Sequence, residues 1–113
     1  MIVYEDNTEI EIDLKEIMQT CRDILLDIKD EHSYFVYSVS DDSNWVHSFL
    51  KEPGGIKISI SNECEFKFQD IENVISRLNC YMQSIGWIGF FSKEIKRTGF
   101  YYCCALRFQY ENF

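Results

Sequence analysis

The chain has 113 residues, of which 46% are hydrophobic and 16% aromatic, and its formal net charge is −8. This length and composition fit one domain with a sizeable core and argue against disorder, so we expect residues 1–113 to form a single domain. The charge disfavours nucleic acid and anionic membranes as partners, because both repel a strongly acidic protein.

The negative charge is concentrated in the first third of the chain. Residues 1–42 carry twelve carboxylates and three basic residues, which gives a net charge of −9. Residues 43–113 carry eight basic and seven acidic residues, which gives +1. A surface of this kind suits a basic protein partner.

The sequence also predicts where the protein resides. Its first residues have neither the basic nor the long apolar segment of a signal peptide. No apolar run approaches the ~20 residues that span a bilayer. The five cysteines form an odd set without C-x-x-C spacing. We therefore predict a cytoplasmic protein with reduced thiols, and we interpret four of them as small buried hydrophobic residues: Cys21, Cys64, Cys80 and Cys104.

The first elements that the pattern predicts are a hairpin and a helix. Residues 9–12 alternate between acidic and apolar side chains, which is typical of a strand, and residues 2–4 can pair with them. Asp13 and Glu16 have the spacing of a capping box. Apolar residues then recur at helical spacing over 14–30, which predicts an amphipathic helix.

The middle of the chain predicts three strands and a short helix. Residues 34–40 are β-branched and aromatic, and residues 41–44 form a turn that can cap a short helix over 45–50. Residues 56–61 and 64–68 both alternate, so we expect a tight hairpin between them. The residues expected to face the core are Phe35, Tyr37, Val39, Ile56, Ile58, Ile60, Cys64, Phe66 and Phe68.

The C-terminal part predicts a second helix and a second hairpin. Asp70 can cap a helix over 71–85, and Gly86 can end it. Residues 87–96 and 100–110 read as two strands joined by a glycine turn. The last strand has the longest apolar stripe, so we expect it at the centre of the sheet with one inward-facing set: Phe100, Tyr102, Cys104, Leu106, Phe108 and Tyr110.

These elements give the order β-α-β-(short α)-β-β-α-β-β. Strands joined by hairpins, with two main amphipathic helices, predict an α+β fold. We expect a two-layer sandwich in which a mostly antiparallel sheet of about five or six strands carries the helices on one face.

The sequence offers little support for catalysis or metal binding. It contains only two histidines, His32 and His47, and it lacks a G-x-S-x-G turn, a P-loop and an EF-hand pattern. Cys103 and Cys104 are adjacent in a predicted strand, so their side chains face opposite sides and cannot bind one ion together. We therefore expect a non-catalytic protein with no cofactor and no metal site. A small-molecule enzyme with acidic catalysts is left as a remote alternative.

The acidic residues of the first helix form a stripe. Glu16, Asp23, Asp27 and Asp30 lie 7, 4 and 3 residues apart, which places them on one side of a helix. Like charges four residues apart cost a few tenths of a kcal/mol each, so the stripe is either a recognition surface or solvated surface that tolerates this cost. The predicted partner-binding residues are Glu16, Asp23, Asp27, Asp30, Glu31, Asp41, Asp42 and, as an aromatic anchor, Trp45.

These observations lead to a prediction of function. We expect an acidic binding or inhibitor protein, namely a cytosolic immunity protein (antitoxin) that neutralises a basic nuclease toxin with its acidic N-terminal third. Carboxylates can imitate the phosphates that a nuclease binds, and they speed association. One alternative is a phage-encoded inhibitor of a host nucleic-acid-binding effector. Another is a structural or oligomerisation subunit, including a homodimer, that uses outer sheet aromatics such as Tyr101 and Trp87.

Overall fold

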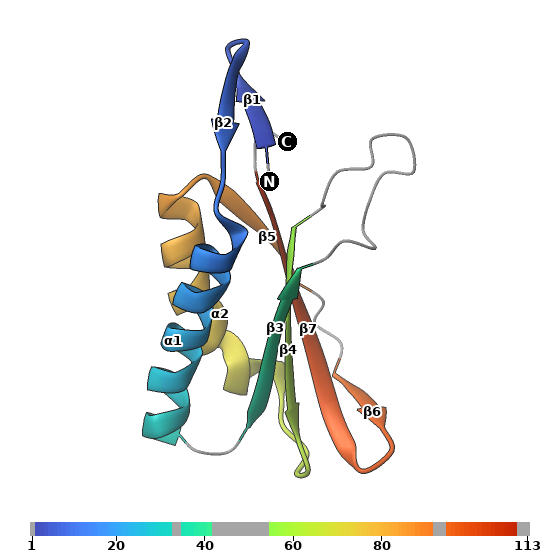
Figure 1. The fold of residues 1–113 in the computed structure, drawn as a ribbon. Coiled ribbons are helices and arrows are strands. Elements are labelled where there is room, and N and C mark those ends of the chain that lie inside the picture. The colour runs from blue at the N-terminus through green and yellow to red at the C-terminus, as the bar shows by residue number, and fades with distance from the viewer. Residues whose placement is uncertain (1, 33–34, 42–54, 92–94, 111–113) are drawn as a thin grey trace.

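Two helices lie side by side on one face of a five-stranded sheet, and a two-stranded hairpin extends beyond them (Figure 1). This computed structural model describes residues 2–32, 35–41, 55–91 and 95–110. The elements are β1 (Ile2–Glu5), β2 (Thr8–Glu11), α1 (Leu14–His32), β3 (Val36–Asp41), β4 (Ile56–Asn62), α2 (Phe68–Ser84), β5 (Trp87–Phe91), β6 (Lys96–Thr98) and β7 (Tyr101–Tyr110). The α+β class is confirmed, and the short helix predicted for 45–50 lies outside the described residues.

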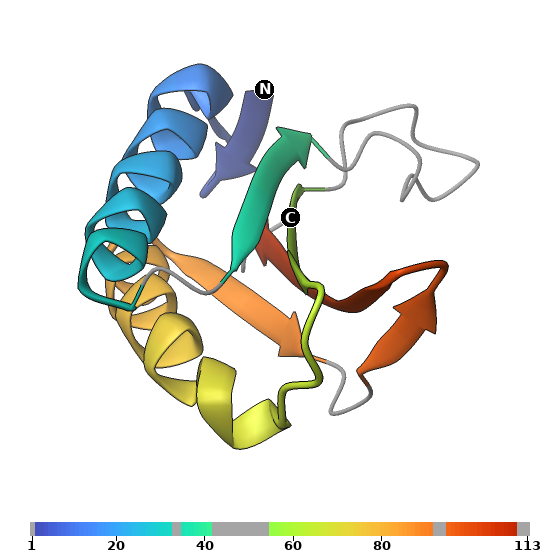
Figure 2. The same ribbon diagram turned by 90° about the horizontal axis from the view of Figure 1, so that it is seen from below.

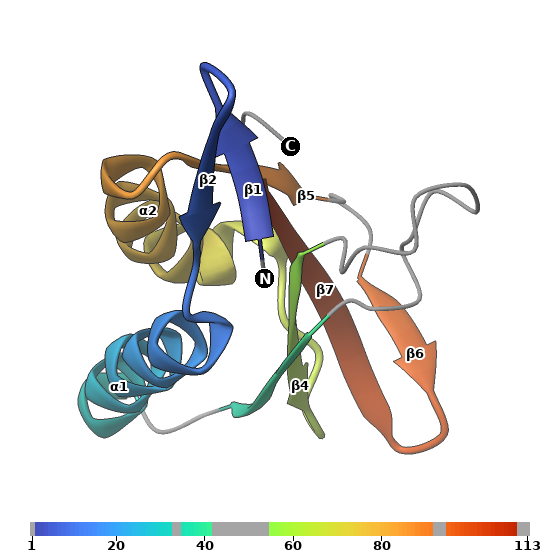
Figure 3. The same cartoon turned by 45° about the horizontal axis from the view of Figure 1, so that its top comes forward.

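The strands of the main sheet are all antiparallel and follow the order β3-β4-β7-β5, with β6 also paired to β7 (Figures 2 and 3). Residues 102–108 of β7 pair with β4, and parts of the same stretch also pair with β5 and β6. A strand has two edges, so β5 and β6 must both lie on the edge of β7 that faces away from β4. The prediction that the last strand is central is therefore confirmed.

The N-terminal hairpin is formed as the alternation predicts. Its strands β1 and β2 are joined by Asp6 and Asn7, whose φ angles are 49° and 63°. Consecutive positive φ angles define the turn that best fits the twist of a two-residue hairpin, and Asp and Asn tolerate them well. Asp13 then begins α1, where its Oδ1 accepts hydrogen bonds from the backbone N–H groups of Lys15 at 3.1 Å and Glu16 at 3.3 Å. Asp13 is thus the cap that the sequence predicts.

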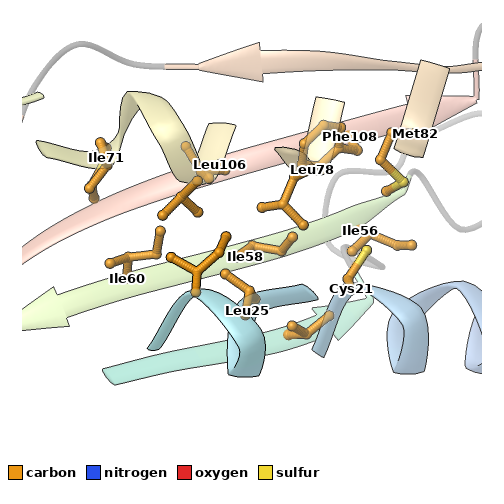
Figure 4. Packing of buried hydrophobic residues seen from close by; sticks show 14 of the residues in the cluster. Cys21, Leu25, Ile56, Ile58, Ile60, Ile71, Leu78, Met82, Leu106 and Phe108 are labelled. Carbon is orange, nitrogen blue, oxygen red and sulfur yellow. The ribbon is translucent and has the colours of Figure 1, made fainter. Parts of the chain in front are cut away.

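The core lies between the helices and the inner face of the sheet. Alternate residues of β4 and β7 point toward the helices, and each helix contributes one apolar face (Figure 4). The inward positions of β3 and β4 are as predicted, with Tyr37 partly buried. The completely buried side chains include Cys21, Leu25, Ile56, Ile58, Ile60, Leu78, Met82, Leu106 and Phe108.

The strand predicted for residues 64–68 is wrong, and so is its hairpin with β4. This segment leads directly into α2, which begins at Phe68 with Lys67 as its N-cap residue. Asp70 does stabilise the helix start, but from the third helical position, where its Oδ2 accepts a hydrogen bond from the backbone N–H of Lys67 at 2.6 Å. Phe66 and Ile71 occupy the positions of a hydrophobic staple, and both are buried in the same core.

Three further predictions are wrong for individual side chains. Cys64 and Cys80 are exposed and not buried, because Cys64 lies in the loop before α2 and Cys80 lies on the outward face of that helix. Phe100 does not belong to the inward-facing set of the last strand. It lies with Gly99 in the turn between β6 and β7, where 85% of its surface is exposed.

These burial differences predict a difference in thiol reactivity. Burial raises the pKa of Cys21 to about 12 and also raises the pKa of Cys104, so both thiols stay protonated at pH 8. We expect iodoacetamide at pH 8 to modify Cys64 and Cys80 at least ~100-fold faster than the two buried thiols, because only the thiolate reacts and opening of the core is rare. Mass spectrometry of peptides after timed labelling measures this ratio. Equal rates at Cys21 and Cys80 would contradict the packing of α1.

Candidate functional site

The exposed face of α1 carries the described carboxylates of the predicted stripe. Glu16, Asp23 and Asp27 are all exposed, and they lie opposite the buried residues of the same helix. Gln19 donates a hydrogen bond from Nε2 to Oδ1 of Asp23 at 3.0 Å, which limits the orientations of that carboxylate. The helical period thus presents these acids to solvent in a row along the outside of the molecule.

Two basic residues of α1 are turned away from this row, toward β3. Arg22 donates a hydrogen bond to the backbone carbonyl oxygen of Val39 at 3.2 Å. The Nζ atom of Lys29 lies 5.9 Å from the centre of the Tyr37 ring, within the range of a cation–π contact. These contacts fasten α1 to the edge of the sheet, and they hold two of the positive charges of the helix away from Asp23 and Asp27, whereas Lys15 is exposed at the start of the helix.

The other predicted binding residues are placed less completely. Asp30 and Glu31 belong to the last turns of α1, but their side chains are not among those described. Asp41 is exposed at the end of β3, two residues after Val39, so it lies on the side of α1 that Arg22 faces and not in line with the stripe. Asp42 and Trp45 lie outside the described residues.

The sequence analysis missed an exposed apolar residue beside the acidic stripe. Leu26 is 48% exposed on α1, three residues after Asp23 and next to Asp27 in the sequence. Its neighbour Leu25 is completely buried. Adjacent helical residues point about 100° apart, so the pair Leu25-Leu26 already indicated that one leucine lies outside the core. Residues three and four apart are neighbours on a helix, so Leu26 lies at the border of the stripe, between Asp23 on one side and Arg22 and Lys29 on the other.

A cleft lies at the Glu16 end of the stripe, between the start of α1 and the end of α2. Its volume is about 340 Å³, and its walls combine carboxylates with aromatic and aliphatic side chains. Trp87 and Tyr110 meet edge to face inside it, with ring centres 6.1 Å apart. Trp87 is only 1% exposed, so its predicted role as an interface aromatic of the outer sheet is wrong. The cleft is lined by Ile12, Asp13, Glu16, Ile17, Tyr81, Ile85, Trp87 and Tyr110.

Other kinds of site find little support in the described part of the chain. No three His, Cys, Asp or Glu side chains gather there in a way that could hold a metal ion. None of the helices described is long and apolar enough to cross a bilayer. Of the cysteines, Cys21 is completely buried among apolar residues with a raised pKa, which makes it an unreactive thiol.

Comparisons with known proteins add no functional information. No protein-family model matches the chain, and neither a curated protein nor a solved structure shows significant similarity to it.

Proposed function

We propose that this protein is a non-catalytic acidic inhibitor, an immunity protein that binds a basic nuclease toxin through the exposed face of α1. The observation that carries the proposal is the separation of charge on that helix. Glu16, Asp23 and Asp27 face solvent, whereas Arg22 and Lys29 are held against β3. A basic surface that approaches the middle of α1 therefore meets Asp23 and Asp27 first.

The surroundings of the stripe supply the other parts of a protein interface. Strong interfaces combine a few buried anchor contacts with a polar rim, and complementary charge raises the association rate. Leu26, at the border of the stripe, and the aromatic cleft beside Glu16 offer two apolar contacts next to the acids. The carboxylates can occupy the positions where the phosphates of a nucleic acid would lie on the toxin, which gives inhibition without catalysis.

The double charge reversal Asp23→Lys/Asp27→Lys tests this proposal. The partner is first identified by co-purification with the product of the neighbouring gene, and association is then followed by stopped-flow fluorescence. We expect the association rate constant to fall by ~10–100-fold at low salt and the salt dependence to become weaker, because steering depends on charges near the contact. The nuclease activity of the partner should be restored in parallel.

A matched control separates the stripe from the net charge. The variant Glu65→Lys/Glu72→Lys changes the charge by the same amount at two exposed positions, one before α2 and one on it. Both double variants are compared at about 0.15 M ionic strength, where charges more than ~8 Å from the contact are screened, and there we expect this control to bind within ~3-fold of the unmodified protein while the stripe variant is still slowed. If both double variants slow association equally, the effect comes from the net charge of the protein and not from the position of the stripe. No effect of either variant would end the proposal.

A second proposal, self-association through the uncovered sheet face, is favoured by exposed apolar side chains there. Tyr101 is 42% exposed and Phe90 is 46% exposed. Val36 is also exposed, but β3 and β5 are opposite edges of the sheet and β4 and β7 lie between them. The apolar surface is thus divided, which makes this the weaker proposal. Elution at twice the monomer mass in gel filtration, lost in Phe90→Ser/Tyr101→Ser and kept in Asp23→Lys/Asp27→Lys, would support it.

A further inference from the structure

The sheet face that carries no helix has a charge opposite to that of α1. Its side chains come from alternate residues of the strands, and those of β4 and β7 are Lys57, Ser59, Ser61, Tyr101, Cys103, Ala105, Arg107 and Gln109. β6 adds Lys96, which is paired with Cys103. Among the described residues that point outward from the five strands, none is an aspartate or a glutamate. Within the described residues, the charged side chains of this face, here called the cationic face, are therefore all basic.

Two of these cations are direct neighbours on the central strands. Lys57 of β4 is the cross-strand partner of Arg107 of β7. Residues directly opposite each other in an antiparallel pair have Cβ atoms about 4.5–5.5 Å apart, and like charges in that position are destabilising. The pairing therefore brings two cationic side chains together on this face.

A hollow lies next to the pair on the same face. Its volume is about 350 Å³, which is at the lower end of the range of roughly 300–1,000 Å³ for ligand pockets. Its lining combines small side chains, namely Ser59, Cys103 and Ala105, with Lys57, Lys96 and Thr98. The hollow exists because the residues that meet across β4 and β7 here are small: Ser59 faces Ala105.

We propose that this hollow binds the phosphate group of a phosphorylated ligand. Lysine ammonium groups bind phosphate as point charges, and serine and threonine hydroxyls donate hydrogen bonds to its oxygens. Lys57 and Lys96 supply the charge, and Ser59 and Thr98 supply hydroxyl donors. A phosphate monoester carries a charge of about −1.5 to −2 at neutral pH. It therefore matches the charge of two lysines better than a ligand with a single carboxylate would. This proposal concerns the layer opposite α1 and does not depend on the inhibitor function.

Titration of the ¹⁵N-labelled full chain with adenosine 5′-monophosphate, with adenosine as the uncharged comparison, tests the proposal. At constant ionic strength we expect saturable shifts of the amide signals of Ser59, Cys103 and Ala105 with the monophosphate and none with adenosine. Lys57→Gln and Lys96→Gln should each weaken binding about 10-fold or more, as for lost hydrogen bonds to a charged group. Lys57→Arg should keep most of the affinity.

The control variant is Lys15→Gln, which removes the same charge at an exposed position of α1 and should leave the affinity unchanged. A thymidine hexanucleotide without terminal phosphates identifies the source of the phosphate. Tighter binding of the hexanucleotide through the same residues assigns the site to a nucleic acid backbone, and weaker binding assigns it to a monoester. Equal shifts with adenosine and the monophosphate, or unchanged affinity in both glutamine variants, would overturn the proposal.

Discussion

Replacing Phe108 by alanine is expected to lower the free energy of unfolding by about 3–5 kcal/mol, the range for deletion of a buried aromatic ring. Phe108 is completely buried near the middle of the sheet, where β7 pairs with both β4 and β5. Its ring meets that of Phe91 edge to face, with centres 5.4 Å apart. The strands on both sides limit how far the structure can close the cavity. Urea denaturation followed by circular dichroism measures the loss.

Gln109→Ala is the matched control for this prediction. Gln109 is the next residue of β7 and points to the uncovered face. Its replacement should change the free energy of unfolding by no more than ~0.5 kcal/mol, as for surface substitutions in general. A shift of one residue in strand register exchanges the two faces, so a large loss for Gln109→Ala with a small loss for Phe108→Ala would contradict the described sheet.

Gly55→Ala is expected to lower the free energy of unfolding by about 3 kcal/mol, the upper part of the usual range for overpacking. Gly55 is buried directly before β4, and an added Cβ would lie 2.1 Å from the carbonyl oxygen of Phe108. The atom in the way belongs to the backbone of the central strand, which also pairs with β5, so it cannot move aside without disturbing the sheet. Urea denaturation again gives the measurement.

Gly99→Ala separates this contact from the effect of backbone conformation. Gly99 has a φ of 62° in the turn before β7, and an added Cβ there would have no atom within 4 Å. Alanine at this position should cost only the roughly 1–2 kcal/mol of a left-handed conformation. If Gly55→Ala proves no more damaging than Gly99→Ala, the close approach of Gly55 to β7 is not as described.

Most of the fold could be predicted because its elements have clear periods. The helical spacing of Ile17, Cys21, Leu25 and Ile28 marks the buried side of α1, and the alternation in β4 and β7 marks their buried faces. The segment before α2 was mispredicted because Phe66 and Phe68 alternate over too short a stretch to distinguish a strand from a helix start. The staple between Phe66 and Ile71, with Asp70 as the third helical residue, is the local signal that decides for a helix.

The acidic stripe was predictable for the same reason, since a helical period fixes which residues share a side. The directions in which the Arg22 and Lys29 side chains point could not be predicted, because each side chain is held by a residue of β3 that is distant in the sequence. The cationic face could not be predicted at all. Lys57 and Arg107 are fifty residues apart, and only the register of β4 with β7 makes them neighbours.

The pairing of β4 with β7 also determines the order in which the protein can fold. Ile56 pairs with Phe108 and Asn62 with Tyr102, so the central ladder joins segments 40–52 residues apart, and contacts of such long range slow folding. During synthesis from the N-terminus, β4 has an unpaired edge and an apolar inner face until residues 101–110 have left the ribosome. Unpaired edges of this kind promote aggregation, and charge opposes it. Residues 1–42, with their net charge of −9, are synthesised before β4. The charge that opposes aggregation is therefore present in the nascent chain before the unpaired strand emerges.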